Sequence, residues 1–395
     1  MTSRENLEQF AIDVILERRR GLRATLLRAL LYTLSLIYER LVQLRLFLYR
    51  KRVLREHALG CLVISIGNLT VGGTGKTPIV EKFARALQKG GRRVAILSRG
   101  YKSVPTHRPR GLLSRLRGAE PEPPRIVSDG ESLLLDSLTA GDEPYMLAHN
   151  LKNVVVLVDK DRVKSGLFAV EKMGADTLLL DDGLQYLHLK HRLDIVLIDR
   201  QAPFGNEFLL PRGTLREPPR NLRRASYIFI TKSTGASNEN LIERIRRYNR
   251  TAEIIECAHQ PLHLQNVVTG EIAPLEKLRA AYIGSICGIA APESFENGLK
   301  ELGAKIEIAK RFIDHHRYSE AEIQNFITRC IRRDLEMIVT TEKDAVRFPR
   351  LTGTDVPIYF LRVEIQILSG HESWEHCVDR ICKPQPLLTP ERFFA

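Results

Sequence analysis

A glycine-rich stretch carries the strongest chemical signal in this chain of 395 residues. The segment Gly67-Asn68-Leu69-Thr70-Val71-Gly72-Gly73-Thr74-Gly75-Lys76-Thr77 departs from the strict phosphate-loop pattern only at Thr70, where that pattern has glycine. Glycines let backbone N–H groups face an anion, and a following helix presents its N-terminus to the same anion. In such a loop the lysine reaches the β- and γ-phosphates and the Thr hydroxyl holds Mg²⁺. We predict a nucleoside triphosphate site formed by Gly72, Gly73, Thr74, Gly75, Lys76 and Thr77.

A pair of acids follows a later apolar run, Leu178-Leu179-Leu180-Asp181-Asp182-Gly183. An enzyme with a phosphate loop needs an acid that faces magnesium at the end of a neighbouring strand. Adjacent carboxylates point in different directions, so we expect one to bind the metal through water while the other positions the loop. The alternative is a solvated Asp-Asp-Gly turn. We predict that Asp181 and Asp182 face the metal.

The elements that must position these residues alternate along the chain. Strand-like apolar runs lie at 62–66, 94–97, 154–158, 177–180, 194–198 and 227–230, and several are separated by helical segments such as 78–87. This alternation predicts an α/β fold with a mainly parallel sheet, which binds ligands at the carboxyl ends of its strands. The pattern changes near 255 and a second α/β unit begins near 281. The predicted division is an N-terminal helix at 1–57, a phosphate-loop domain at 58–255, a hairpin-like linker at 256–280 and a second α/β domain at 281–395.

Composition excludes several classes of protein. Apolar residues make up 44% and charged residues 27%, a globular balance. No run of uncharged apolar residues is long enough for a polytopic membrane protein. The six cysteines form no Cys-x-x-Cys pair, so we expect reduced thiols rather than a disulfide framework or a zinc site.

The net charge of +13 is concentrated in three segments. Residues 1–60 carry +6, and residues 101–125 and 212–224 carry +4 each. Aromatic residues are not interleaved with the basic ones and no nucleic-acid module is present, so we predict no nucleic-acid partner. The charge instead favours an anionic membrane surface or a phosphorylated substrate.

The N-terminal segment carries an apolar stripe at alternating spacings of three and four: Leu27, Leu30, Leu34, Ile37, Leu41, Leu44 and Leu48. This spacing predicts a helix of about six turns, and arginines and a lysine flank it on both sides. Only ten uncharged residues stand between Arg28 and Glu39, too few to cross a bilayer. We expect an amphipathic helix at a membrane surface; the alternatives are packing on its own domain or a coiled-coil seam.

Several motifs in order resemble the tetraacyldisaccharide 4′-kinase family of lipid A biosynthesis. The resemblance covers roughly residues 25–365. Besides the phosphate loop, the matching segments are Leu97-Ser98-Arg99-Gly100-Tyr101, Gly141-Asp142-Glu143-Pro144, Asp181-Asp182-Gly183-Leu184-Gln185, Gly205-Asn206, Leu210-Pro211, Leu215-Arg216-Glu217-Pro218, Cys287-Gly288-Ile289, Pro292-Glu293, Asp314-His315-His316 and Thr340-Thr341-Glu342-Lys343-Asp344-Ala345.

The resemblance implies the reaction and the setting. ATP, with Mg²⁺, would phosphorylate the 4′-hydroxyl of tetraacyldisaccharide 1-phosphate and form lipid IVA. The family has two α/β/α domains, the first of phosphate-loop NTPase type, with a two-stranded linker, a cleft between the domains and a membrane-associated N-terminal helix. The expected location is the cytoplasmic face of the inner membrane, peripheral or N-terminally anchored. The oligomeric state is left open.

The resemblance also implies roles for residues. Asp142 corresponds to the family's catalytic base, and its histidine partner lies in Asp314-His315-His316; we favour His315 over His316. Lys76 would complete the catalytic set, and Glu217 would join Thr77, Asp181 and Asp182 at the metal. Residues expected to contact substrate are Glu143, Arg162, Gln185, Asn206 and Arg216.

The sequence departs from the family at Leu184 and Tyr186, which replace Phe and His, and at Ala291, which replaces Asn. Two other classes of protein remain as alternatives: a phosphate-loop ATPase of the partitioning or metal-chaperone type and a non-catalytic nucleotide-binding membrane scaffold. The ATPases usually carry a second lysine at the start of the loop, where this chain has Val71.

Overall fold

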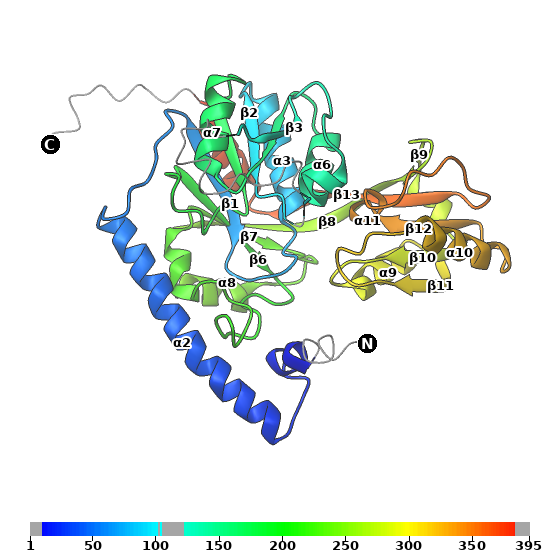
Figure 1. The fold of residues 1–395 in the computed structure, drawn as a ribbon, viewed down its shortest axis with the longest axis horizontal. Helices are drawn as coiled ribbons and strands as arrows, with labels where there is room; N and C mark the ends of the chain where they lie inside the picture. Colours follow the sequence, from blue (N-terminus) through cyan, green and yellow to red (C-terminus); the bar gives the residue numbers. More distant parts are fainter. Residues whose placement is uncertain (1–9, 102, 105–121, 384–395) are drawn as a thin grey trace.

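The strands form one continuous sheet (Figure 1). The structure is a computed structural model that describes residues 10–101, 103–104 and 122–383. The strand order is β11-β10-β12-β13-β8-β7-β6-β1-β5-β2-β4-β3, and the short β9 pairs with β8. Only the pairs β3–β4, β8–β13 and β8–β9 are antiparallel among the described strands. The predicted α/β class with a mainly parallel sheet is confirmed.

The first lobe contains the phosphate loop and is built on one end of the strand order, with helices on both faces of the sheet. Its strands are β1 Leu62–Asn68, β2 Val94–Ser98, β3 Arg125–Ser128, β4 Val155–Val158, β5 Thr177–Asp181, β6 Leu193–Asp199 and β7 Tyr227–Thr231. Its helices are α3 Lys76–Lys89, α5 Ser137–Ala140, α6 Asp142–Asn150, α7 Arg162–Glu171, α8 Glu239–Arg246 and the 3₁₀ helix η1 Pro219–Arg224. Alternate strand residues enter separate cores: Ile64 packs in the core that includes α3, while Val63 packs in the core that includes α7. The strands are apolar on both faces because helices cover both.

The second lobe repeats this plan on a smaller scale. Its strands are β10 Tyr282–Cys287, β11 Lys305–Arg311 and β12 Met337–Thr341, and its helices are α9 Pro292–Glu301, α10 Glu320–Ile331, α11 Glu342–Ala345 and the 3₁₀ helix η2 Leu275–Leu278. Helix α10 begins at a capping box in which Ser319 and Glu322 satisfy each other's backbone N–H groups. Two apolar cores fill the two sides of these strands.

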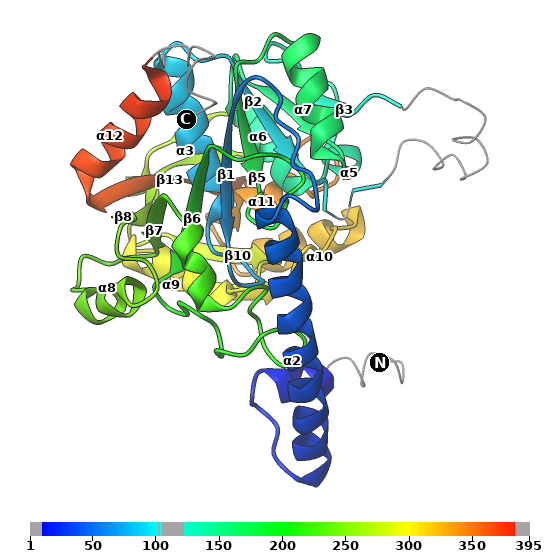
Figure 2. The same cartoon turned by 90° about the vertical axis from the view of Figure 1, so that its left-hand side faces the viewer.

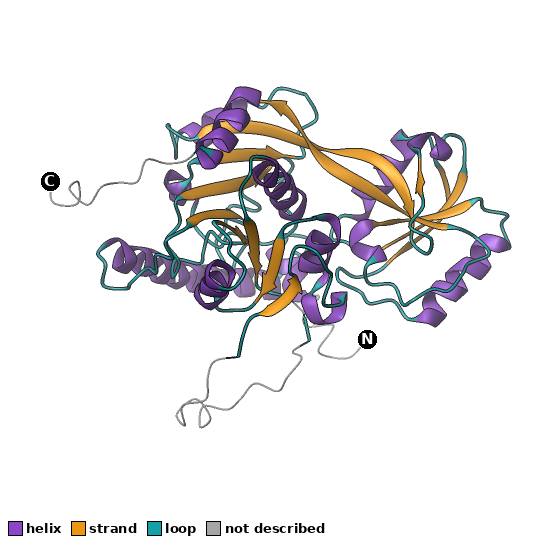
Figure 3. Ribbon diagram, turned by 90° about the horizontal axis from the view of Figure 1, so that it is seen from above, coloured by secondary structure: helices purple, strands orange, loops and turns teal. Residues whose placement is uncertain are grey.

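Two long strands join the lobes (Figures 1 and 3). Strand β8, Glu253–Asn266, pairs in parallel with β7 and then antiparallel with β13, Ile358–Ser369, which in turn pairs with β12. Strand β8 continues through residue 256, the start of the expected hairpin-like linker at 256–280, and its main partner comes from far along the chain; the bounds of that linker stay a prediction. A small hairpin of β8 with β9, Ile272–Ala273, does lie in that range.

The C-terminal helix α12, His371–Cys382, belongs with the first lobe. It packs against α3, and the rings of Trp374 and Phe83 are 4.7 Å apart. Strand β13 thus carries the chain back to the first lobe before α12 begins; the second domain at 281–395 stays a prediction, and its residues 384–395 lie outside the described part of the chain.

Helix α2, Leu22–Arg50, extends along the side of the first lobe (Figures 1 and 2). Ala24, Ser35 and Tyr49 are buried, and the Tyr38 hydroxyl donates to the Arg216 carbonyl at 3.0 Å. Much of the predicted apolar stripe lies on the other face: Leu30, Leu34, Ile37, Leu41 and Leu44 are exposed. Within the described residues, no helix has the length and apolar character needed to span a membrane. Most of the predicted basic loop at 103–125 lies outside the described residues.

Candidate active site

The phosphate loop connects buried β1 to the N-terminus of α3. Gly72 and Gly75 have φ angles of 114° and 78°, which favour glycine. A Cβ added to Gly72 or Gly73 would meet nothing within 4 Å, so this backbone faces open space. No side chain caps α3, whose first N–H groups remain available. Lys76 Nζ lies 3.4 Å from Asn68 Oδ1 and 3.7 Å from Asp182 Oδ1, close to the loop but without a short partner. This arrangement suits a polyphosphate.

The paired acids emerge beside this loop because β5 lies between β1 and β2. Ser98 donates to Asp181 Oδ2 at 3.0 Å, whereas the buried Asp181 Oδ1 has no partner. Burial, reinforced by the charges of Glu143 and Asp182, raises the pKa of Asp181 to about 7. Burial also opposes the ionisation of Asp182, but Lys76 and Arg216 outweigh it and hold the pKa of Asp182 below its usual value.

These residues fit magnesium and ATP. A divalent ion would give the buried Asp181 oxygen the partner that it lacks and would favour its ionised form. Among the residues that the structure describes, no three His, Cys, Asp or Glu side chains converge on a point that could hold a metal. The ion would therefore need the Thr77 hydroxyl and phosphate oxygens in addition to Asp181, as in other phosphate-loop sites.

Arg216, Gln185 and Glu217 brace the loop from the other side. Arg216 Nη1 donates to both oxygens of Asp182, at 2.7 and 2.8 Å. Gln185 Nε2 donates to the Asn68 carbonyl and to Glu217, each at 3.1 Å. Arg224 bridges the two oxygens of the buried Glu217 at 2.7 and 2.8 Å. Glu217 thus anchors its own segment, and its predicted place at the metal stays a prediction.

Tyr186, one of the departures from the family pattern, holds the start of α7. Its hydroxyl donates to Asp161 at 3.2 Å and accepts from the Arg162 backbone N–H at 3.0 Å. The Arg162 guanidinium lies over the Tyr186 ring, 5.0 Å from its centre, and its buried Nε has no partner. Burial lowers the pKa of Arg162, and the charges of Asp181 and Asp182 partly oppose that shift.

Asn206 is placed elsewhere. Its Nδ2 donates to the Ile15 carbonyl at 2.9 Å, and its Oδ1 accepts from the Thr214 backbone N–H. Asn206 thus ties the N-terminal segment to the first lobe, and contact with substrate remains a prediction.

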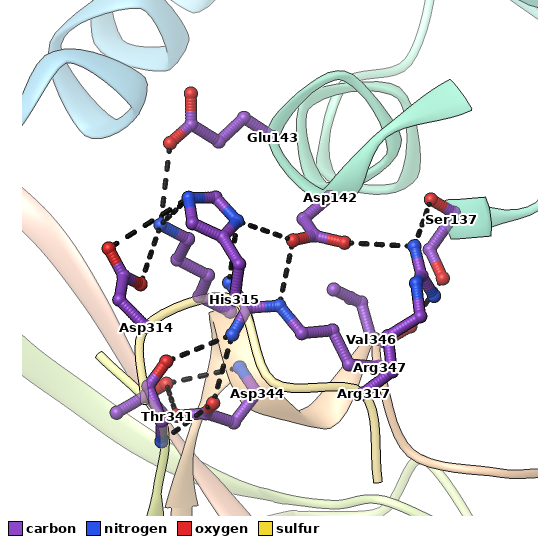
Figure 4. Close-up of polar contacts among 12 residues, drawn as sticks. Ser137, Asp142, Glu143, Asp314, His315, Arg317, Thr341, Asp344, Val346 and Arg347 are labelled. Carbon is purple, nitrogen blue, oxygen red and sulfur yellow. Dashed lines mark hydrogen bonds and ion pairs between the residues drawn. The ribbon is translucent and has the colours of Figure 1, made fainter. Parts of the chain in front are cut away.

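A second cluster gathers around Asp142, the first residue of α6 (Figure 4). Asp142 Oδ2 lies 3.0 Å from His315 Nδ1 and accepts from Arg347 Nε at 2.7 Å, while Oδ1 accepts from Arg317 Nη2 at 3.3 Å. Although burial opposes ionisation, the His315 hydrogen bond and the Arg347 charge hold the pKa of Asp142 below its usual value. His316 instead contacts Glu322 at 3.2 Å, so the histidine that faces Asp142 is His315, as the sequence analysis favoured.

The contacts of His315 define its tautomer. The ionised Asp142 can only accept, so Nδ1 carries the proton and donates to it. In the neutral form of His315, Lys343 Nζ, 3.4 Å from Nε2, can donate to the lone pair on that nitrogen. Arg347 Nη2 also lies 3.4 Å from Nδ1, but this longer contact joins two donors and is not a hydrogen bond. His315 has a φ of 66°, an uncommon conformation for a residue with a side chain and one that collects at functional sites.

The lobes supply opposite sides of this cluster. Asp142 and Glu143 come from the first lobe, and Lys343 lies 3.6 Å from Glu143 across the gap. Sequence reasoning missed Arg317, Lys343 and Arg347 as site residues. The available signal was the motif Thr340-Thr341-Glu342-Lys343-Asp344-Ala345, which was given no role and contains Lys343; Arg347 follows two residues after it.

Comparison with known proteins gives similarity over most of the chain. A family model described as tetraacyldisaccharide-1-P 4′-kinase matches residues 27–383. The tetraacyldisaccharide 4′-kinase of Syntrophus aciditrophicus is 39% identical, with 90% of this chain and 93% of the relative covered. That of Halothermothrix orenii is 33% identical, with 92% and 95% covered. The crystal structure of LpxK from Aquifex aeolicus in complex with ATP matches with a TM-score of 0.69 and 29% identity, covering 90% of this chain and 100% of that one.

Proposed function

The chain belongs to the tetraacyldisaccharide-1-P 4′-kinase family, and from that premise we propose how its own residues carry out the transfer at a membrane surface. It transfers the γ-phosphoryl group of ATP to the 4′-hydroxyl of a tetraacylated disaccharide 1-phosphate. The observation that carries the proposal is the contact between Asp142 of the first lobe and His315 of the second.

Asp142 is the general base. His315 and Arg347 occupy its Oδ2, whereas Oδ1 receives only the longer contact from Arg317, so Oδ1 has the capacity to accept a proton from the sugar hydroxyl. The proton moves to Asp142 as the 4′-oxygen bonds to the γ-phosphorus and the bond from that phosphorus to the β-phosphate oxygen breaks, releasing ADP. In a loose transition state this transfer comes late, so a carboxylate with a low pKa suffices.

The phosphate loop holds the donor. The N–H groups of the loop and Lys76 bind the triphosphate, and Thr77 with Asp181 would hold Mg²⁺, which neutralises charge that develops on the phosphate oxygens when it is bound. Asp182, which is held by Arg216, lies 3.7 Å from Lys76 Nζ and orients the ammonium group. Arg162, buried with an unpaired Nε, supplies a cation on the same side.

The direct test is phosphoryl transfer itself. Incubation with ATP labelled at the γ-phosphate and tetraacyldisaccharide 1-phosphate in detergent should give labelled lipid. Loss of ATP without labelled lipid would favour a phosphate-loop ATPase, and binding of ATP with neither product would favour a non-catalytic scaffold. Either outcome would overturn the kinase assignment.

We further propose that α2 lies on the cytoplasmic face of the inner membrane. The support is its exposed apolar face, with Leu30, Leu34, Ile37, Leu41 and Leu44, next to basic residues such as Arg45 and Arg50. An amphipathic helix of this kind binds by inserting its apolar face between headgroups and is helped by anionic lipids.

The double variant Ile37→Glu with Leu41→Glu should bind vesicles containing phosphatidylglycerol at least about tenfold more weakly, because each buried apolar side chain contributes roughly 1.5–3 kcal/mol. Co-sedimentation with vesicles measures the change. A control with Ile272→Glu and Ile331→Glu, which alters exposed apolar residues of the second lobe, should bind as the parent does. Equal weakening in both would move the lipid contact away from α2.

A further inference from the structure

Arg347 is the most deeply enclosed cation of the Asp142 cluster (Figure 4). It follows α11 in the second lobe, and its side chain has no exposed surface. Its Nε donates to Asp142 Oδ2 at 2.7 Å, and its Nη1 donates to the Gly288 carbonyl at 3.0 Å and to Asp344 at 3.2 Å. The planar guanidinium therefore joins a carboxylate of the first lobe to two acceptors of the second.

Asp344 fixes the other end of this guanidinium. It is fully buried and accepts from the Gly288 N–H at 2.9 Å, the Tyr318 hydroxyl at 2.9 Å and the Thr341 hydroxyl at 2.6 Å. These three hydrogen bonds fix the orientation of the Asp344 carboxylate. Because Arg347 Nη1 donates to that carboxylate, Asp344 in turn fixes the orientation of the guanidinium. The direction in which Arg347 Nε points at Asp142 is thus set by the second lobe.

The charges around Asp142 come from several elements. Arg347 and Arg317 contact it directly, and His315 contacts it as a hydrogen-bond donor. The next groups outward alternate in sign, since Lys343 lies between Glu143 and Asp314 at 3.6 Å from each. The titratable and charged groups that face the carboxylate or its partners are His315, Arg317, Arg347, Lys343, Glu143, Asp314, Asp344 and Tyr101.

We infer that Arg347 is a positioning residue for phosphoryl transfer: it holds the Asp142 carboxylate in one orientation between the lobes and leaves Oδ1 for the sugar hydroxyl. This inference rests on the proposed role of Asp142 as the base. The same contact favours the charged form of Asp142, so the base stays ionised at lower pH than an ordinary aspartate does. A lysine cannot reproduce both effects, because its single ammonium lacks the fork that reaches Asp142, Gly288 and Asp344 together.

The test compares Arg347→Met and Arg347→Lys across pH, with saturating ATP and lipid. Arg347→Met should lower kcat at least about tenfold and move the acid limb of the kcat profile up by about one pH unit, since a carboxylate that loses a close cation titrates at higher pH. Arg347→Lys should leave that limb near its original position but still lower kcat. The KM for ATP should stay within about twofold in both variants, because the change affects the transfer step and not the donor site.

A purely structural role for Arg347 predicts a different result. It would lower the melting temperature and the amount of active enzyme without moving the acid limb. A folded Arg347→Met enzyme with the parent's limb and kcat overturns the inference; if that variant does not fold, an unchanged kcat in Arg347→Lys overturns it. Asp142→Asn separates the two proposals. If this variant retains activity, Asp142 is not the general base. If it loses activity while the Arg347 variants have normal kcat and a normal pH profile, only the positioning role of Arg347 is contradicted.

Discussion

Replacing Asp142 with Asn should lower kcat by about two to four orders of magnitude, the range that a positioned general base contributes. Asn has the same shape and can still accept from Arg347, but it cannot take up a proton from the sugar hydroxyl. ATP binding should be unchanged, because Lys76 and the loop glycines lie outside the Asp142 cluster. Steady-state kinetics with the lipid acceptor, together with ATP affinity by calorimetry, measure the two quantities separately.

Asp136→Asn is the matched control. Asp136 lies in the same lobe and caps α5 by accepting from the Thr139 N–H, a role that Asn fills about as well. Its kcat should stay within about twofold of the parent's. A similar loss in both variants would indicate disturbance of this region of the lobe, and near-normal turnover in Asp142→Asn would remove Asp142 from the base role.

Replacing Arg362 with Met should lower the free energy of unfolding by about 3–5 kcal/mol, the usual cost of leaving buried charges without their partner. Arg362 lies on β13 and pairs with Glu81 of α3 and with Glu342 of α11 at 2.6 Å. All three side chains are less than a tenth exposed, so water cannot take the place of the guanidinium. Urea unfolding followed by far-ultraviolet circular dichroism gives the change.

Arg85 offers a control on the same carboxylate. It pairs with Glu81 at 2.7 Å, but 42% of its side chain is exposed. Arg85→Met should therefore cost no more than about 1 kcal/mol, as solvent-screened pairs do. Comparable losses in the two variants would show that burial does not decide the strength of this cluster.

The phosphate loop and Asp181 could be predicted because their chemistry is local in sequence. A strand, a run of glycines and Lys76-Thr77 occupy one short segment. Acids at the end of an apolar run reach the same site if that run forms a strand next to the one that precedes the loop. The contact of Asp142 with Arg347 joins residues 205 positions apart and depends on how two lobes meet, which no local pattern encodes. The family resemblance supplied Asp142 and His315, and it gave no role to Arg347.

The spacing of apolar residues predicted whether several segments are helices or strands, but it did not predict which other elements they pack against or pair with. It predicted the N-terminal helix and left packing of the apolar face against its own domain as an alternative, and the structure turns much of that face outward. The partner of β8 could not be predicted for a related reason: β8 pairs with β13, about a hundred residues later, and the return of the chain through β13 brings α12 to the first lobe. Such pairings are set by competition among strands across the whole sheet.

The position of Trp374 on α12 makes the protein's fluorescence selective. It is the only tryptophan in the chain, and its ring meets Phe83 and Phe229, both in the first lobe. Its emission therefore reports how far water reaches this part of the first lobe and whether the C-terminal helix is docked. Unfolding of the second lobe alone would not change the surroundings of this ring. An unfolding curve recorded by emission gives the stability of one half of the molecule, and its divergence from a backbone signal measures how far the two halves melt separately.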